Sequence, residues 1–126
     1  MPVTRVTDNR TQRFRLTKSH KFMTKVLLKR ENDRLKGFVI SGHSTQNCDD
    51  LDGKLLCAAV SSAAYMTANG ITEIAGCECD IVVEDGYMSL SLLKDSHAAQ
   101  TILRSFELHI RQLTEQYSNI KLNLEV

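Results

Sequence analysis

The segment GHSTQNCDDLDGKLLCAAVSS, residues 42–62, contains the residue types of a nucleophilic centre: His43, Cys48 and Cys57. A cysteine attacks as the thiolate, which both a neighbouring imidazolium and the positive end of a helix stabilise. Cys57 falls in the first two turns of an expected helix, and His43 ends an expected strand. The connecting loop can bring the two side chains within hydrogen-bond distance, about 3 Å. We therefore consider His43 and Cys57 as a base and its nucleophile.

Two other interpretations of these residues stay open. A Cys near the start of an Ala-rich helix is commonly a small core residue. A metal site could instead use His43, Cys48 and Cys57, with Cys77 and Cys79 as further ligands. Structural zinc sites generally have paired ligands such as C-x₂₋₄-C, whereas this chain has only C-x-C, within an expected strand. We expect neither a metal nor a cofactor.

The elements before Cys57 follow from hydrophobic spacing and turn residues. Residues 23–30 and 35–43 read as short strands on either side of the polar turn ENDR, which predicts a hairpin. Residues 43–53 are polar and predict a loop. Residues 54–70 predict a helix that is apolar on nearly all sides and hence buried. Asn69-Gly70 would end this helix, and three aspartates are candidates for its N-cap: Asp49, Asp50 and Asp52.

A second hairpin is expected from residues 71–84 and 87–94. The two strands are joined by Asp85-Gly86, a dipeptide that readily adopts the positive φ angles of a tight turn. Alternation along the first strand puts four apolar side chains on one face. We expect this face, including both of its cysteines, to point into the core: Cys77, Cys79, Ile81 and Val83.

A long amphipathic helix and a closing strand complete the chain. Asp95 or Ser96 is expected to cap the helix, and apolar residues recur at helical spacing from Ala99 to Tyr117. Residues 120–126 alternate and predict a strand. The order is ββαββαβ, which indicates a single α+β domain with a mixed β-sheet and two helices.

Composition excludes several classes of protein. At 126 residues the chain fits one domain that can bury a core without disulfides or metal. No apolar run is long enough to cross a bilayer, so we expect no membrane association. The first residues lack the apolar core of a secretory signal, which favours a cytoplasmic location with reduced thiols.

Charge is distributed unevenly. Residues 1–21 carry six basic side chains and one acidic one, whereas the remainder has ten basic and fourteen acidic residues. We expect residues 1–22 to be a basic, disordered N-terminal extension, followed by the folded domain at residues 23–126. Contact with nucleic acid would be possible only through this extension.

Two motifs resemble a known family. GFVISGH at residues 37–43, followed after a polar loop by CAAVS at residues 57–61, is similar to the signature of the ribosomal-processing cysteine protease family, Prp. The resemblance extends over residues 23–126 and implies a Cys/His dyad. By position, His43 would be the base, Cys57 the nucleophile, Gly42 part of the supporting turn, and Ser61 a residue on the same helix face as Cys57.

The resemblance also implies a function. Members of this family are homodimeric thiol proteases that act in ribosome biogenesis, removing the N-terminal extension of a bacterial large-subunit ribosomal protein after an aromatic residue. The implied mechanism passes through an acyl-enzyme and needs no cofactor. An alternative is a catalytically impaired, ribosome-associated or dimeric binding protein of the same fold.

The sequence departs from the family pattern in three respects, one of which is a slightly longer loop before Cys57. Ser44 stands where Ala usually follows the Gly-His pair, which is a small change. Lys54 stands three residues before Cys57, where the family has Asp. We expect a neighbouring carboxylate, such as Asp52, to replace that Asp, while the Lys54 charge would itself favour the thiolate.

Overall fold

The computed structural model describes residues 23–42 and 51–125. The expected extension at residues 1–22 lies outside this part, so that prediction stays untested. The described elements follow the predicted ββαββαβ order, which confirms the α+β domain with two helices and a mixed sheet. The elements are β1 (Thr24–Glu31), β2 (Arg34–Ser41), α2 (Leu51–Asn69), the π-helical turn η2 (Gly70–Ile74), β3 (Cys79–Glu84), β4 (Tyr87–Leu92), α3 (His97–Gln116) and β5 (Ile120–Leu124).

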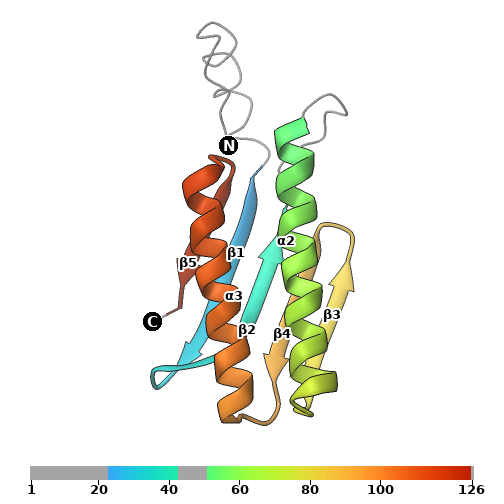
Figure 1. Cartoon of the computed structure of the whole chain (residues 1–126), viewed down its shortest axis with the longest axis vertical. Helices are drawn as coiled ribbons and strands as arrows, with labels where there is room; N and C mark the ends of the chain where they lie inside the picture. The colour runs from blue at the N-terminus through green and yellow to red at the C-terminus, as the bar shows by residue number, and fades with distance from the viewer. Residues whose placement is uncertain (1–22, 43–50, 126) are drawn as a thin grey trace, which may run out of the picture.

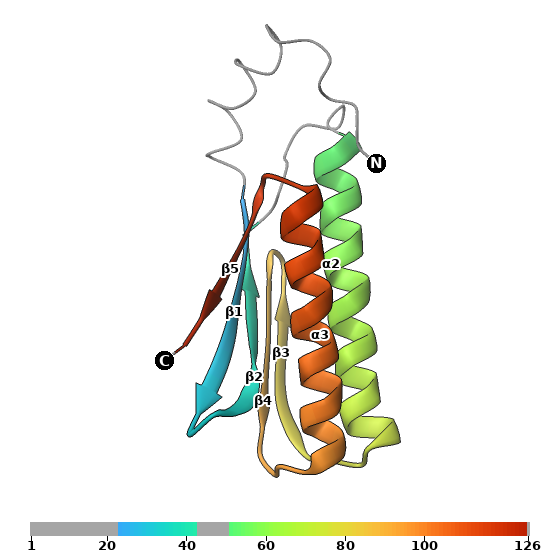
Figure 2. The same cartoon turned by 60° about the vertical axis from the view of Figure 1, so that its left-hand side comes forward.

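The five strands form one sheet in the order β3-β4-β2-β1-β5. Strand β5 runs parallel to β1, and all other neighbours are antiparallel. Both helices lie on the same face of this sheet, so the domain has two layers (Figures 1 and 2). The opposite face is not covered by any described element.

Two-residue turns close both hairpins. Asn32 and Asp33 both have positive φ angles, 54° and 66°, as in the mirror-image turn that matches the twist of paired strands. In the second hairpin Gly86 has φ 70°, as expected for the Asp-Gly turn. The two predicted hairpins are therefore confirmed.

The core lies between the sheet and the helices. Alternate strand residues such as Val26, Leu28 and Leu90 are fully buried on the helix-facing side. Phe38 of the central strand stacks on Phe106 of α3, with ring centroids 4.6 Å apart. One face of β1, β2 and β4 is thus apolar and packed, which is the pattern of a sheet covered on one side.

Helix α2 is not buried on all sides, contrary to our expectation. Tyr65 and Met66 are 48% and 76% exposed, because no described element covers the outer side of the helix. The buried residues of α2 recur at helical spacing: Gly53, Leu56, Val60, Ala64, Thr67 and Ala68.

Among the described residues, no helix combines the length and apolarity needed to cross a bilayer.

The strand predicted to begin at residue 71 begins at Cys79 instead. Asn69-Gly70 ends the α-helix, but the chain continues as the wide turn η2, in which the Ala75 N–H donates to the Gly70 carbonyl at 2.8 Å. This extra turn buries Ile71 completely. Burial of that side chain explains why the segment stays helical despite its strand-like composition.

Only part of the expected core face of β3 is buried. Cys77 is buried and Cys79 is half-buried, and burial, with the nearby Cys77 as a smaller cause, raises the pKa of the Cys79 thiol. Ile81 and Val83 are 38% and 51% exposed, so the prediction was wrong for them. Helices are about 10 Å wide and strands about 4.8 Å apart, so two helices cover about four strands. Edge strand β3 is left partly uncovered.

The start of α3 is fixed by a polar network. Ser96 caps the helix by accepting the Ala99 N–H at 3.0 Å. Asp95 accepts hydrogen bonds from Arg34 Nε at 2.8 Å and from Gln100 Nε2 at 2.9 Å. The buried Gln100 also bonds the backbone of Leu35 through both its oxygen and its nitrogen. Ser96 is therefore the cap, while Asp95 and Gln100 connect α3 to β2.

We predict a pH-dependent contribution of Asp95 to stability. The hydrogen bond from Arg34 lowers the pKa of Asp95 below its ordinary value of 3.8. This contribution is therefore complete above that pH and is lost as the pH falls through the lower, folded-state value. Asp95→Asn should reduce the free energy of unfolding by about 0.5–1 kcal/mol at neutral pH. Urea unfolding down to about pH 2 should show the difference from the wild type disappearing.

The exposed pair of Arg30 and Asp33 supplies the control. Asp33 is 97% exposed and 3.5 Å from Arg30. Asp33→Asn should leave the unfolding free energy unchanged at all of these pH values. An equal effect of the two substitutions would contradict a specific role for Asp95.

Candidate active site

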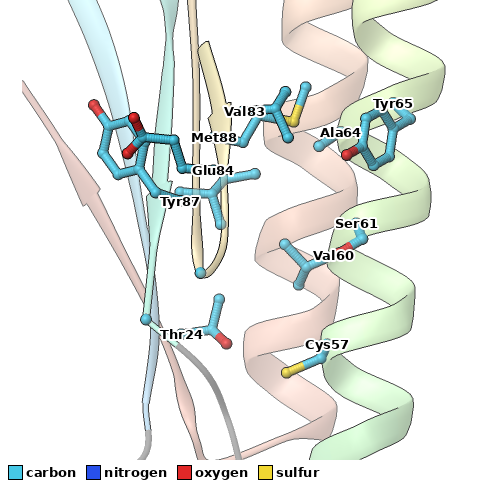
Figure 3. Close-up of a pocket in the computed structure, with 13 residues that line it drawn as sticks. Thr24, Cys57, Val60, Ser61, Ala64, Tyr65, Val83, Glu84, Tyr87 and Met88 are labelled. Atoms are coloured by element: carbon cyan, nitrogen blue, oxygen red, sulfur yellow. The ribbon is translucent and has the colours of Figure 1, made fainter.

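Cys57 is the seventh residue of α2 and is half-buried. Its Sγ atom points from the helix toward the sheet (Figure 3). It precedes the buried Val60 on the side of the helix that packs on the strands. The thiol thus lies at the boundary between the core and the surface.

A small cavity lies beside this thiol. Its volume is about 120 Å³, and it is open to the surface between α2, the ends of β1 and β2, and the β3–β4 turn. Cys57 and Gly42, fifteen positions apart in the sequence, both line it. The other lining residues are Thr24, Ile40, Val60, Ser61, Ala64, Tyr65, Val83, Glu84, Gly86, Tyr87 and Met88.

Gly42 holds the end of β2 in a conformation that suits only glycine. Its φ is +86°, and a Cβ atom there would lie 2.4 Å from the Met23 carbonyl oxygen. Its N–H donates to the Gly86 carbonyl at 2.9 Å, which fixes this end of β2 against the β3–β4 turn. His43 follows directly in the sequence but lies outside the described residues, so its predicted role is not tested by the geometry.

The other predicted site residues are placed differently around α2. At about 100° per residue, Ser61 lies about 40° from Cys57 around the helix axis, and it lines the cavity. Lys54 lies about 60° from Cys57 on the same side as Ser61, and Asp52 about 140° away on the other side. Both are exposed, and neither lines the cavity as the described residues define it. Ser61 is thus brought together with Cys57, and Asp52 is not.

Three aspartates near the helix start are the candidates for the cap and for the carboxylate that would replace the family's Asp. Asp52 lies inside α2 rather than before it, so it is not the N-cap. Asp49 and Asp50 lie outside the described residues, as does Cys48.

The structure adds residues that the sequence did not single out. Thr24, Glu84 and Tyr87 line the cavity opposite α2. Glu84 and Tyr87 face each other across the β3–β4 turn, and their side chains lie on the face of the sheet that points away from α2 (Figure 3). The Asp-Gly turn signal was enough to locate this pair on a hairpin. Nothing in the sequence indicated that the hairpin lies beside Cys57, because that depends on strand order.

The described cysteines of the hypothesised metal site do not lie together. Cys57 is near the start of α2, whereas Cys77 and Cys79 follow its far end, and the helix between them is about 18 Å long. Cys77 Sγ lies 3.0 Å from Ser96 Oγ, at the base of α3. Across residues 23–42 and 51–125, no group of three or more potential ligands could hold a metal ion.

Comparison with known families decides the assignment. The family model described as cysteine protease Prp matches residues 23–121. The chain belongs to the Prp family. It is a cysteine peptidase, and the match includes both Gly42 and the helix that carries Cys57.

Several solved structures share this fold. The ribosomal processing protease Prp from S. aureus with a covalently linked product peptide has a TM-score of 0.74 and 22% identity, covering 82% of this chain and all of that one. The same protease with a substrate peptide has a TM-score of 0.73 and 20% identity over the same shares. SMU.848 from Streptococcus mutans has a TM-score of 0.70 and 21% identity, covering 85% of this chain and 99% of its own. No curated protein is significantly similar in sequence.

We predict that Gly42→Ala disrupts the site. The added Cβ would clash with a backbone oxygen, so we expect a loss of about 2 kcal/mol or more in unfolding free energy, together with loss of peptidase activity. Gly76→Ala is the matched control, because Gly76 also has a positive φ, +68°, but no atom lies within 4 Å of the place that a Cβ would occupy. It should cost only about 1 kcal/mol. Urea unfolding and a peptidase assay would compare the two, and equal costs would contradict the proposed contact.

Proposed function

We propose that this peptidase removes the N-terminal extension of a bacterial large-subunit ribosomal protein, with Cys57 as nucleophile and His43 as base. The observation that carries the proposal is that Gly42 and Cys57 line one cavity. His43 follows Gly42 directly in the sequence, so the proposal assigns it as the base that serves the thiol at this cavity. The S. aureus relatives, which are ribosomal processing proteases with bound peptides, support the substrate class.

The mechanism is acyl transfer. The Cys57 thiolate attacks the scissile carbonyl carbon, and backbone N–H groups near the start of α2 stabilise the oxyanion. As the C–N bond breaks, His43 gives its proton to the leaving amine and an acyl-enzyme thioester remains. His43 then takes a proton from water, which attacks the thioester and restores the thiol. Ser61, on the same side of α2, is placed to bond the substrate backbone at this cavity.

Thiol reactivity tests the proposed dyad. At pH 7, iodoacetamide should alkylate Cys57 faster than the buried Cys77, as measured by mass spectrometry of the peptides. His43→Ala should slow this alkylation and reduce peptide cleavage by about 100-fold or more. Cys77→Ala is the control and should leave both rates unchanged. If Cys57 reacts no faster than Cys77 in the wild type, the chain is the impaired binding protein considered above.

The substrate is tested separately with the ribosomal precursor from the same cell. Wild-type protein should shorten the precursor at its N-terminus, and Cys57→Ala should not. Intact-mass measurement identifies the bond that is cut. A precursor that is left intact by a protein whose Cys57 reacts as predicted would refute the substrate and leave the dyad standing.

We further propose that the chain acts in the cytoplasm as a homodimer. The cysteines of the described residues form no disulfide with one another, which is compatible with a reducing compartment. The outer side of the helix layer offers a surface for a second copy, since Met66 and Leu108 are 76% and 59% exposed there. A hollow of about 620 Å³ between the helices is lined by Ala59, Ser62, Ala63, Met66, Thr67, Gly70, Ile102, Ser105, Phe106 and His109.

A charge on this surface should prevent dimerisation. Leu108→Glu should convert the dimer into a monomer, because a buried unpaired carboxylate is strongly unfavourable at an interface. Sedimentation equilibrium would measure the mass. Leu93→Glu is the control, because Leu93 is 64% exposed but follows β4, away from the outer side of the helices. A monomeric wild type, or equal effects of both substitutions, would contradict the proposal.

A further inference from the structure

Strand β3 is an open edge of the sheet. It pairs with β4 on one side, and on its other side no strand lies within the described part of the chain. Three consecutive apolar side chains of this edge are exposed: Ile81, Val82 and Val83, at 38%, 39% and 51%. An apolar edge with unpaired backbone groups is a template for an additional strand.

The two faces of this edge differ in chemistry. Ile81 and Val83 are paired with Leu90 and Met88 of β4, both buried, so they lie on the helix side of the sheet. Val83 also lines the cavity that contains Cys57. The apolar side of the edge is therefore continuous with the candidate active site.

The opposite face of the edge carries two carboxylates. Asp80 and Glu84 lie there on either side of Val82, across from Ser91 and Tyr87 of β4. Both carboxylates are exposed. Side chains of an added strand would lie about 5 Å from these residues. Such a strand would thus place every second side chain near carboxylates and the others on the apolar side.

Charge restricts what can occupy this edge. Residues 55–93 contain five acidic side chains and no Lys, Arg or His. A second copy adding its own β3 would bring Asp80 and Glu84 of both copies together, and like charges across neighbouring strands are destabilising. A basic segment is the complementary occupant.

We propose that the β3 edge docks an extended segment of the substrate in which basic and apolar side chains alternate, and that it leads this segment to Cys57. This inference rests on the proposed peptidase function. The added strand makes backbone hydrogen bonds to β3, its basic side chains lie near Asp80 and Glu84, and its apolar side chains contact Ile81 and Val83. The edge thereby selects the substrate and fixes its register relative to the thiol.

A binding experiment separates this role from catalysis. Full-length Cys57→Ala protein binds a fluorescein-labelled peptide that alternates Arg and Leu, and anisotropy gives the affinity. The matched peptide alternates Glu and Leu and should bind at least about tenfold more weakly. Adding Asp80→Lys and Glu84→Lys should weaken binding of the Arg peptide by at least about tenfold. Glu73→Lys, in η2 rather than on β3, should change it less than about twofold.

Backbone methylation tests strand addition itself, with the side chains of β3 left unchanged. Successive residues of a strand direct their N–H groups to opposite edges. Peptides N-methylated at every Arg, or instead at every Leu, should therefore differ: one set should lose binding by at least about tenfold and the other should retain it. Attraction by charge alone would leave the two sets equal and would overturn the proposal.

Other results would overturn the proposal or show that the β3 edge binds something other than the substrate. Equal binding of the Arg and Glu peptides, or equal losses in Glu73→Lys and the β3 variant, would overturn the proposal. Peptide affinity that falls as protein concentration rises would show that a second copy of the chain occupies the β3 edge. If replacing Arg13, Arg15 and Lys18 by Ser raises the peptide affinity at least about tenfold, residues 1–22 of the chain itself compete for the β3 edge. Failure of cleavage with peptide binding intact would refute the peptidase function alone.

Discussion

One-sided burial of the sheet is the constraint on which the rest of this structure depends. Each strand has one apolar face, and the described residues provide two helices to cover five strands. Both helices therefore pack on the same face, with Phe38 of the central strand stacked on Phe106 of α3. Two helices span about 20 Å, less than the width of the sheet, so one edge strand is left partly uncovered. The position of α2, and with it Cys57, follows from this packing.

The candidate active site lies where three elements end together. Strand β2 ends at Ser41, and the N–H of the following Gly42 donates to the Gly86 carbonyl in the β3–β4 turn. Helix α2 passes alongside, with Cys57 directed toward the sheet. Backbone contacts set this arrangement, since the Met23 oxygen leaves no room for a side chain at position 42. The site is thus built from a rigid helix and a constrained strand end. That rigidity suits a nucleophile which must meet its base in a fixed geometry.

The uncovered edge and the site are two results of the same packing. Because α2 does not reach over all of β3, Val83 remains accessible and joins the cavity around Cys57. The charge of this region is acidic throughout residues 55–93, while residues 1–21 are basic. A peptidase for a basic protein would gain selectivity from such an edge without any change at the thiol. Substrate choice and chemistry could then vary independently in this fold.

The sequence by itself determined the order of elements and both hairpins and narrowed the α3 cap to Asp95 or Ser96, because these depend on local spacing and turn chemistry. It indicated Cys57 as the reactive candidate through the resemblance of its motifs to those of the family. It misjudged α2 as buried all round and residues 71–74 as strand. It also missed Thr24, Glu84 and Tyr87. Which faces become covered, and which distant segments meet, depends on how many layers form and on strand order. Those are properties of long-range packing, so only the tertiary structure decided that Gly42, Cys57 and the β3–β4 turn share one cavity.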